Sequence, residues 1–261
     1  MALKRRDQVL VARGLAESRS QAQRLIEHGQ VEIDEGAAWQ LARKPSQRVS
    51  EDEGLRVHKG EADRYVSRAG LKLAAALDAF SIDPAGTKVL DVGASTGGFT
   101  DCILQRGAAH VVCVDVGHDQ LHARLQTDSR VTNLEGVNAR ELDAAFASAY
   151  SDDGFDLVIM DVSFISQTLI LPALTRVMAG KACLISLVKP QFEVGPSGLG
   201  KGGIVKNEAL KNAALKTVTE CALELGFVDI QTISSPILGG DGNEEYLMVA
   251  HWRREKGRPH A

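Results

Sequence analysis

The sequence predicts an α/β protein with a mostly parallel, seven-stranded sheet covered by helices on both faces, preceded by a small α+β domain. Three observations support this fold class. Strand-like and helical apolar patterns alternate regularly after Pro84. The run 88–101 passes from an apolar strand through a glycine turn into a helix. The first 60 residues carry a separate, shorter pattern of their own. Repeated strand–helix units of this kind are typical of parallel sheets.

The N-terminal segment predicts two short helices followed by short strands. Apolar residues recur at helical spacing from Asp7 to Val31, interrupted by Gly14 and by Ser18, a candidate cap for the second helix. Val31–Ile33 alternates as a strand, and Val49 and 55–57 continue as strand-like pieces. We therefore expect a domain at 1–60, a polar linker at 61–68, the main domain at 69–254 and a C-terminal tail at 255–261.

The main domain is expected to begin with an amphipathic helix at 69–80. The predicted strands are 88–93, 111–116, 131–136, 156–162, 183–189, 229–234 and 246–252. The predicted helices between them are 99–106, 119–126, 140–149, 166–178 and 208–225. No helix separates the last two strands, so we expect an antiparallel pair at one edge of the sheet, as in class I, Rossmann-like methyltransferases.

Composition indicates a globular protein without a membrane span. Of the 261 residues 44% are hydrophobic, and the net charge is −4, so no basic surface extends over the whole chain. Residues 1–28 nevertheless hold six Lys or Arg against three acidic residues, which favours contact with a polyanion there. The four cysteines lie far apart, as expected of thiols in a reducing compartment. We therefore expect a cytoplasmic protein.

The glycine turn after the first strand of the main domain predicts a nucleotide-type cofactor. Its spacing is D-x-G-x-x-x-G-G, beginning at Asp91, whereas dinucleotide sites require G-x-G-x-x-G. This difference disfavours NAD and favours S-adenosylmethionine, whose methionine end needs no pyrophosphate cradle. Asp115 ends the next strand, where a carboxylate would bind a ribose diol. The predicted cofactor residues are Asp91, Gly93, Ser95, Gly97, Gly98, Phe99, Asp115, Asn138 and Asp161.

The stretch Arg6–Val31 resembles the alpha-L RNA-binding domain of small-subunit ribosomal protein four, through its G-L-A-x-S-R-x-x-A run. That module presents basic residues of its second helix to structured RNA. Guanidinium groups suit this task because their planar fork matches phosphate oxygens. The resemblance implies RNA binding by Arg5, Arg6, Arg13, Arg19 and Arg24.

Residues 4–254 as a whole resemble the hemolysin-A-like (TlyA) ribosomal RNA methyltransferases, whose main domain is similar to the FtsJ 2′-O-methyltransferases. Five motifs in order carry the resemblance: Tyr65–Leu73, the Asp91 glycine turn, Met160–Phe164, Leu187–Glu193 and Gly242–Leu247. The resemblance implies transfer of a methyl group from S-adenosylmethionine to a ribose 2′-hydroxyl, in a cytidine of ribosomal RNA or a ribosomal subunit.

The FtsJ resemblance also implies a Lys-Asp-Lys-Glu tetrad, which matches Lys72, Asp161, Lys189 and Glu245. Positions 161 and 189 follow neighbouring strands, where the ends of parallel strands converge on a ligand. A 2′-hydroxyl is a poor nucleophile, so its proton must be removed as it attacks, and a desolvated lysine can serve as the base. We expect Lys189 to be that base, oriented by Asp161. Glu244 is the competing match for Glu245.

Two aromatic residues and three alternatives complete the hypothesis. Phe164 and Phe192 follow strand ends, where either could stack on a base, although a core role is more usual for Phe. His118 and His122 resemble a zinc-binding helix, but Asp stands where the protease motif has Glu, and we expect no metal. A non-catalytic RNA-binding or ribosome-assembly factor is the main alternative function. A membrane-active hemolysin is a weaker one, because no membrane span or signal segment is present.

Overall fold

The computed structural model describes residues 3–27, 29–36, 38–58, 60 and 64–254. The predicted tail at 255–261 and residues 61–63 of the predicted linker lie outside the described residues. The chain divides into two compact units, with the boundary between Arg64 and Tyr65. Each unit is described by itself.

The N-terminal unit packs two helices against small antiparallel sheets. Its strands order as β3-β2-β5 and β1-β4, and its core includes Leu10, Leu25, Ile26 and Val31. The Ser18 hydroxyl accepts a hydrogen bond from the Gln21 N–H at 3.2 Å, at the start of the second helix. The elements are β1 (Lys4–Arg5), α1 (Arg6–Ala12), α2 (Arg19–Glu27), β2 (Val31–Asp34), β3 (Trp39–Leu41), β4 (Arg48–Val49) and β5 (Leu55–Val57).

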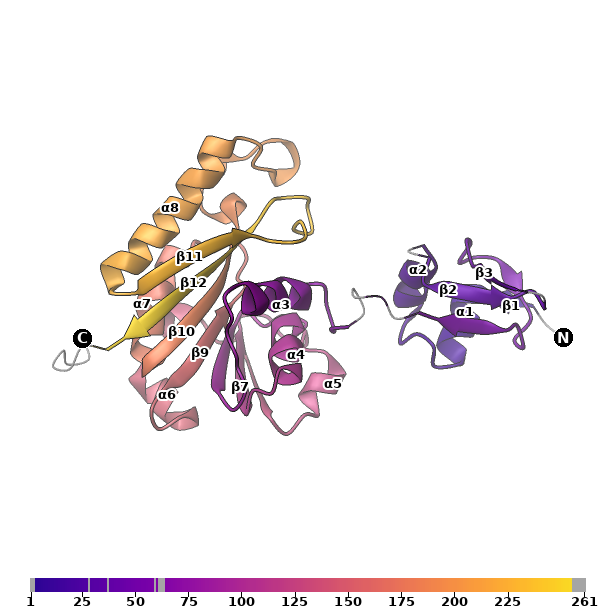
Figure 1. Cartoon of the computed structure of the whole chain (residues 1–261), viewed down its shortest axis with the longest axis horizontal. Helices are drawn as coiled ribbons and strands as arrows, with labels where there is room; N and C mark the ends of the chain where they lie inside the picture. The colour runs from indigo at the N-terminus through magenta and orange to yellow at the C-terminus, as the bar shows by residue number, and fades with distance from the viewer. Residues whose placement is uncertain (1–2, 28, 37, 59, 61–63, 255–261) are drawn as a thin grey trace. The chain divides into compact units, whose positions relative to one another are not determined.

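The second unit alternates strands and helices, as the apolar pattern predicted (Figure 1). Its helices are α3 (Ala69–Ala79), α4 (Gly98–Gln105), α5 (Ala123–Gln126), α6 (Ala144–Tyr150), α7 (Leu171–Val177) and α8 (Glu208–Leu225). Its strands are β6 (Lys88–Val92), β7 (His110–Asp115), β8 (Val131–Glu135), β9 (Phe155–Met160), β10 (Met178–Val188), β11 (Val228–Ser234) and β12 (Tyr246–Arg253).

The seven strands of this unit form one sheet in the order β11-β12-β10-β9-β6-β7-β8. β12 is antiparallel to both of its neighbours, and the pairs from β10 to β8 are parallel. The predicted antiparallel pair at one edge is confirmed, with β11 outermost. This register puts Val188, the end of β10, opposite Tyr246, the start of β12. Residue 189 directly follows Val188 and residue 245 directly precedes Tyr246, so both adjoin this pair of residues.

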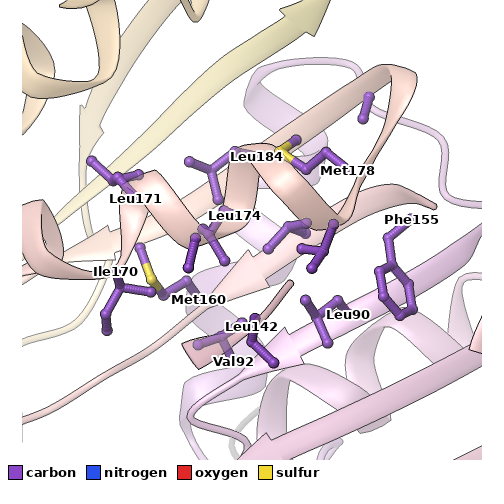
Figure 2. Packing of buried hydrophobic residues seen from close by; sticks show 14 of the residues in the cluster. Leu90, Val92, Leu142, Phe155, Met160, Ile170, Leu171, Leu174, Met178 and Leu184 are labelled. Carbon is purple, nitrogen blue, oxygen red and sulfur yellow. The ribbon is translucent and has the colours of Figure 1, made fainter. Parts of the chain in front are cut away.

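The sheet has a hydrophobic layer on each face. Successive side chains of a strand point to opposite faces, so alternate residues of the central strands pack into different layers. Leu90, Val92 and Met160 pack with residues of α7 such as Leu171 and Leu174, as Figure 2 shows. Residues of the same strands with odd numbers, such as Val89 and Ile159, pack against α3 and α4. The sheet is thus covered on both faces, which leaves its strand ends as the place for polar chemistry.

Three predicted helices and the linker differ from the expectation in length. The helix predicted at 119–126 forms only over Ala123–Gln126, because Asp119 has a left-handed φ of +55°. Asp143 caps α6 and so divides the pattern predicted at 140–149. The pattern predicted at 166–178 divides at Ile170, between the 3-10 helix η3 (Gln167–Leu169) and α7. The linker expected at 61–68 ends earlier, since Tyr65 is buried in the second unit.

Candidate active site

The turn after β6 brings the backbone against the start of the loop between β9 and the 3-10 helix η3 (Gln167–Leu169). Gly93 has a φ of +81°, and a Cβ there would lie 2.6 Å from the Asp161 carbonyl oxygen. Gly97, with a φ of +90°, precedes the first residue of α4. Glycine is required at both positions, because side chains rarely adopt this φ and none would fit at Gly93. The glycine turn therefore joins the predicted cofactor site to the loop that carries Asp161.

A pocket of about 370 Å³ opens beside this turn, at the carboxyl ends of β6, β7 and β9. The Asp115 carboxylate is held at its edge by two backbone hydrogen bonds, from the Ser95 N–H and the Gly117 N–H, each 2.8 Å. Carboxylate oxygens accept more than one hydrogen bond each, so Asp115 can still bind a diol. The predicted residues that line the pocket are Gly93, Ser95, Asp115, Asn138 and Asp161.

Four other predicted cofactor residues lie behind the pocket wall. Asp91, Gly97, Gly98 and Phe99 are buried and do not line this pocket. They form the end of β6 and the start of α4, so they hold the turn that the pocket uses. Motif spacing alone could not separate lining residues from supporting ones, because both belong to the same glycine turn.

Asp91 is fully buried, and this burial raises its pKa to about 7. One carboxyl oxygen accepts the Thr100 hydroxyl at 2.5 Å, and the neighbouring charges of Asp161 and Asp115 raise the pKa further. Burial disfavours the charged form of a carboxyl group. Asp91 is thus mostly protonated below neutral pH, which limits negative charge behind the pocket.

We expect the stability of the second unit to fall as the pH rises from about 4 to 7. The folded pKa of Asp91 lies above its unfolded value, so unfolding releases its proton in this window and the proton favours the folded state. The lost stability is on the order of 4 kcal/mol. Thermal unfolding of wild type and Asp91→Asn across this range checks it: the wild type should lose stability relative to the variant. Parallel pH curves would contradict it.

Lys189 and Asp161 meet at the carboxyl ends of β10 and β9. The Lys189 Nζ lies 2.6 Å from the Asp161 Oδ1 and donates a hydrogen bond to the Ser163 Oγ at 3.0 Å. Both side chains of the ion pair are mostly buried. An ammonium has three donors, so one position on Nζ is left for a further group. Asp161 also lines the pocket, so this pair lies beside the predicted site of the methyl donor.

Lys72 and Glu245 form a second, more deeply buried pair. The Lys72 Nζ donates to a Glu245 carboxylate oxygen, and the two side chains are 9% and 3% exposed. Lys72 comes from α3 and Glu245 directly precedes β12. Glu244 points elsewhere and binds the Lys211 Nζ at 2.6 Å. Of the two adjacent glutamates, Glu245 is therefore the one that reaches Lys72.

Phe164 is the most exposed aromatic residue near the pocket. It is 91% exposed and has a left-handed φ of +64°, an uncommon conformation for a bulky residue. Its ring lies 5.1 Å from that of Phe192, centroid to centroid. Such exposure is unlike a core role, and it leaves a ring available for stacking.

A hydrogen-bonded support behind the site escaped the sequence reasoning. The Glu193 carboxylate accepts from the Ser166 hydroxyl at 2.5 Å and from the Gln167 N–H at 2.9 Å. The Gln167 amide donates to the Leu187 carbonyl at 2.7 Å. Burial raises the pKa of Glu193. These contacts tie the loop after β9 to the end of β10, and the only signal in the sequence was that Glu193 closes one of the five motifs.

The two histidines of the zinc-like motif do not share a helix. His122 caps α5 by accepting the Arg124 N–H at 3.2 Å, and His118 lies 3.7 Å from Glu135. Within the described ranges, no group of three or more His, Cys, Asp or Glu side chains could hold a metal ion. In the same residues, no helix combines the length and apolar character needed to cross a membrane.

The predicted RNA-binding arginines differ in exposure. Arg6 is 1% exposed and pairs with Glu53 at 2.8 Å, so it stabilises the N-terminal unit and is not available to RNA. Arg5 and Arg19 both contact the buried Asp7, whose pKa is lowered chiefly by its hydrogen bond from Arg5. The exposed candidates are Arg13, Arg19 and Arg24, with Arg5 partly exposed.

Comparison with known protein families agrees with both units. The FtsJ-like methyltransferase model matches residues 65–252, and the S4 domain model matches residues 5–55. The chain belongs to the FtsJ-like methyltransferase family. The FtsJ-like model covers the β6 glycine turn, both lysine–carboxylate pairs and the pocket. The S4 match covers both N-terminal helices, with Arg13 directly after the first and Arg19 and Arg24 on the second.

Relatives of this FtsJ-like methyltransferase share nearly its whole length. The 16S/23S rRNA (cytidine-2′-O)-methyltransferase TlyA of Mycobacterium tuberculosis is 45% identical, over 93% of this chain and 87% of its own. YqxC of Bacillus subtilis, a candidate rRNA methyltransferase, is 42% identical over 96% and 86%. A solved structure, a candidate hemolysin from Streptococcus thermophilus, is 38% identical with a TM-score of 0.73, covering 98% of this chain and 90% of its own.

Membership of this family implies S-adenosylmethionine as the methyl donor, and the pocket fits it. Asp115 offers carboxylate oxygens for a ribose diol, and the glycine turn leaves the backbone uncovered at Gly93. We expect Gly93→Ala to weaken S-adenosylmethionine binding at least tenfold, because its Cβ must displace the Asp161 backbone. Calorimetry checks this, with Gly86→Ala as the control: Gly86 also has a positive φ but has open space around it. Equal affinities of both variants would contradict it.

Proposed function

We propose that this protein transfers a methyl group from S-adenosylmethionine to the 2′-hydroxyl of a cytidine in ribosomal RNA. The observation that carries the proposal is the Lys189–Asp161 pair beside the pocket, together with the buried Lys72–Glu245 pair, since Lys189 and Glu245 adjoin the paired residues Val188 and Tyr246. The names of the relatives support the substrate. Sites of this composition suit a ribose, whose hydroxyls need both donors and acceptors.

The proposed mechanism uses Lys189 as the base. The Lys189 ammonium first gives one proton to water, and its Nζ then accepts the 2′-hydroxyl proton while Asp161 and Ser163 hold the lysine in place. The 2′-oxygen then bonds to the methyl carbon as the carbon–sulfur bond breaks, which leaves a neutral thioether. S-adenosylmethionine supplies the electrophilic methyl of a sulfonium. Lys72 and Glu245 position the ribose and the adjacent phosphate, and Phe164 stacks on a nucleobase.

The N-terminal unit recruits the RNA in this proposal. Arg13, Arg19, Arg24 and the partly exposed Arg5 lie on or beside its two helices. Guanidinium groups bind phosphate and structured RNA without reading much sequence. Ribosomal RNA or ribosomal subunits as the partner place the protein in the cytoplasm.

Transfer of tritiated methyl groups tests the proposal. Wild-type protein and Lys189→Ala are incubated with S-adenosylmethionine and with separated ribosomal subunits from cells that lack this protein. We expect label in the RNA of at least one subunit with wild type and a strong reduction with the variant. Absence of label in both subunits, despite RNA binding, would favour the non-catalytic RNA-binding alternative.

A further inference from the structure

Two glycine-rich loops lie near the strand ends that carry the lysine–carboxylate pairs. The first, residues 194–207, connects η4 (Pro190–Phe192) to α8, and the second, residues 235–245, connects β11 to β12. We call them the rim loops. The first begins five residues after Lys189 and the second ends at Glu245, so each is close in sequence to a residue of the proposed ribose site. The proposed function gives neither loop a task.

Asn243, in the second rim loop, forms side-chain hydrogen bonds to the backbone of the first. Its side chain is buried, with the Oδ1 accepting the Val205 N–H at 2.9 Å and the Nδ2 donating to the Gly203 carbonyl at 3.0 Å. Its own carbonyl accepts the Gly239 N–H at 2.8 Å. A Cβ on Gly239 would collide with a Glu245 carboxylate oxygen. Asn243 thus connects the first rim loop, through hydrogen bonds, to the turn of the second rim loop that packs against Glu245.

The first rim loop carries two exposed lysines, in and directly after a turn that a backbone hydrogen bond closes. The Gly200 N–H donates to the Ile204 carbonyl at 3.0 Å, and Gly202 and Gly203 have φ values of +74° and +75°. Lys201 lies inside this turn and Lys206 follows it, and both are exposed. Residues 194–207 contain no Asp or Glu. Across the described part of the chain, neither lysine makes an ion pair within 4 Å.

The acidic residues flanking this loop are already paired. Glu193 binds Ser166 and Gln167, and Glu208 and Glu244 both bind Lys211. Open space surrounds the Cα of several rim-loop glycines. Gly240 is one of them, and it has neither a positive φ nor a packing neighbour to require glycine. Glycines of this kind permit a close approach of another molecule to the backbone.

We propose that the first rim loop binds RNA phosphates next to the target nucleotide through Lys201 and Lys206. This inference rests on the proposed function and adds a second RNA-binding surface to it, within the methyltransferase unit itself. RNA is the occupant that the site favours, because the loop is positively charged, has no acidic residue and begins five residues after Lys189. Lysine suits this task as a flexible point charge for phosphate.

The test measures RNA binding without turnover. Full-length Lys201→Ala/Lys206→Ala is titrated with a fluorescein-labelled, unmethylated ribosomal RNA transcript at several salt concentrations. Two lost phosphate contacts should raise Kd about tenfold and reduce the slope of log Kd against log salt by about 1.4 to 1.8. Lys201→Arg/Lys206→Arg should bind like wild type. The matched control is Lys88→Ala/Lys181→Ala, which removes two exposed lysines near the amino-terminal ends of β6 and β10, away from the rim loops.

The outcomes separate this proposal from the proposed function. Weaker RNA binding by the alanine pair alone, with unchanged S-adenosylmethionine affinity, supports the rim-loop surface. Equal Kd and equal slopes for the alanine pair and wild type overturn it, and they leave methyl transfer to be judged by the tritium experiment. An equal loss in the Lys88→Ala/Lys181→Ala control also overturns it, since the effect would then follow from net charge.

Discussion

Replacing Lys189 by alanine is expected to lower kcat for RNA methylation by on the order of 10²- to 10⁴-fold. The variant removes the proposed proton acceptor, while the predicted cofactor residues that line the pocket are unchanged. S-adenosylmethionine affinity should therefore change far less than kcat. Single-turnover methylation and calorimetry measure the two quantities separately. Lys181→Ala, an exposed lysine of the same strand, is the control and should keep wild-type kcat.

Lys189→Arg tests whether Lys189 acts by accepting a proton or by its positive charge alone. Arginine keeps the positive charge beside Asp161 but does not give up its proton near neutral pH. The proposed mechanism therefore predicts a loss of kcat close to that of the alanine variant. Recovery of most activity with arginine would mean that Lys189 acts by orientation and charge, and the assignment of the base would be wrong.

Breaking the buried Lys72–Glu245 pair is expected to cost about 3–5 kcal/mol of unfolding free energy. Lys72→Met leaves the Glu245 carboxylate, which is only 3% exposed, without its partner charge. For a unit of this size the loss corresponds to a decrease in Tm of roughly 6–20 °C. Scanning calorimetry of wild type and variant measures it.

The double variant Lys72→Met/Glu245→Leu is the matched control for that prediction. Apolar residues of similar volume often replace a buried ion pair without loss of stability, so its Tm should lie near that of wild type. Both variants should lose methylation. Glu245→Leu is measured alone as well. A destabilisation of the double variant equal to the sum of those of Lys72→Met and Glu245→Leu would contradict the coupling between the two side chains.

The sequence predicted the fold well because its signals were local. Period-two and helical apolar patterns marked the strands and most helices, and the D-x-G-x-x-x-G-G spacing marked the cofactor turn. Arg6 shows the limit of such reasoning. Its neighbours suggested an RNA-facing arginine, whereas the folded chain brings Glu53, 47 positions away, to its guanidinium. Glu245 shows the same limit, because it is told apart from Glu244 only by its distant partner Lys72, while Glu244 binds Lys211.

The rim-loop link was also beyond the sequence. Asn243 lies within a recognised motif, but its partners Gly203 and Val205 are 40 and 38 residues away. No periodicity reports such a contact, because it depends on how two irregular loops meet above the sheet. The supporting contacts of Gln167 and Glu193 are of the same kind.

The position of the new methyl group tests the central claim most directly. Ribosomal RNA labelled by wild-type protein is hydrolysed in alkali and its products are identified by mass spectrometry. A 2′-O-methyl group blocks cleavage of the following phosphodiester bond, so the account predicts label in an alkali-stable dinucleotide that begins with cytidine. Label recovered in a mononucleotide, on a base, would contradict it.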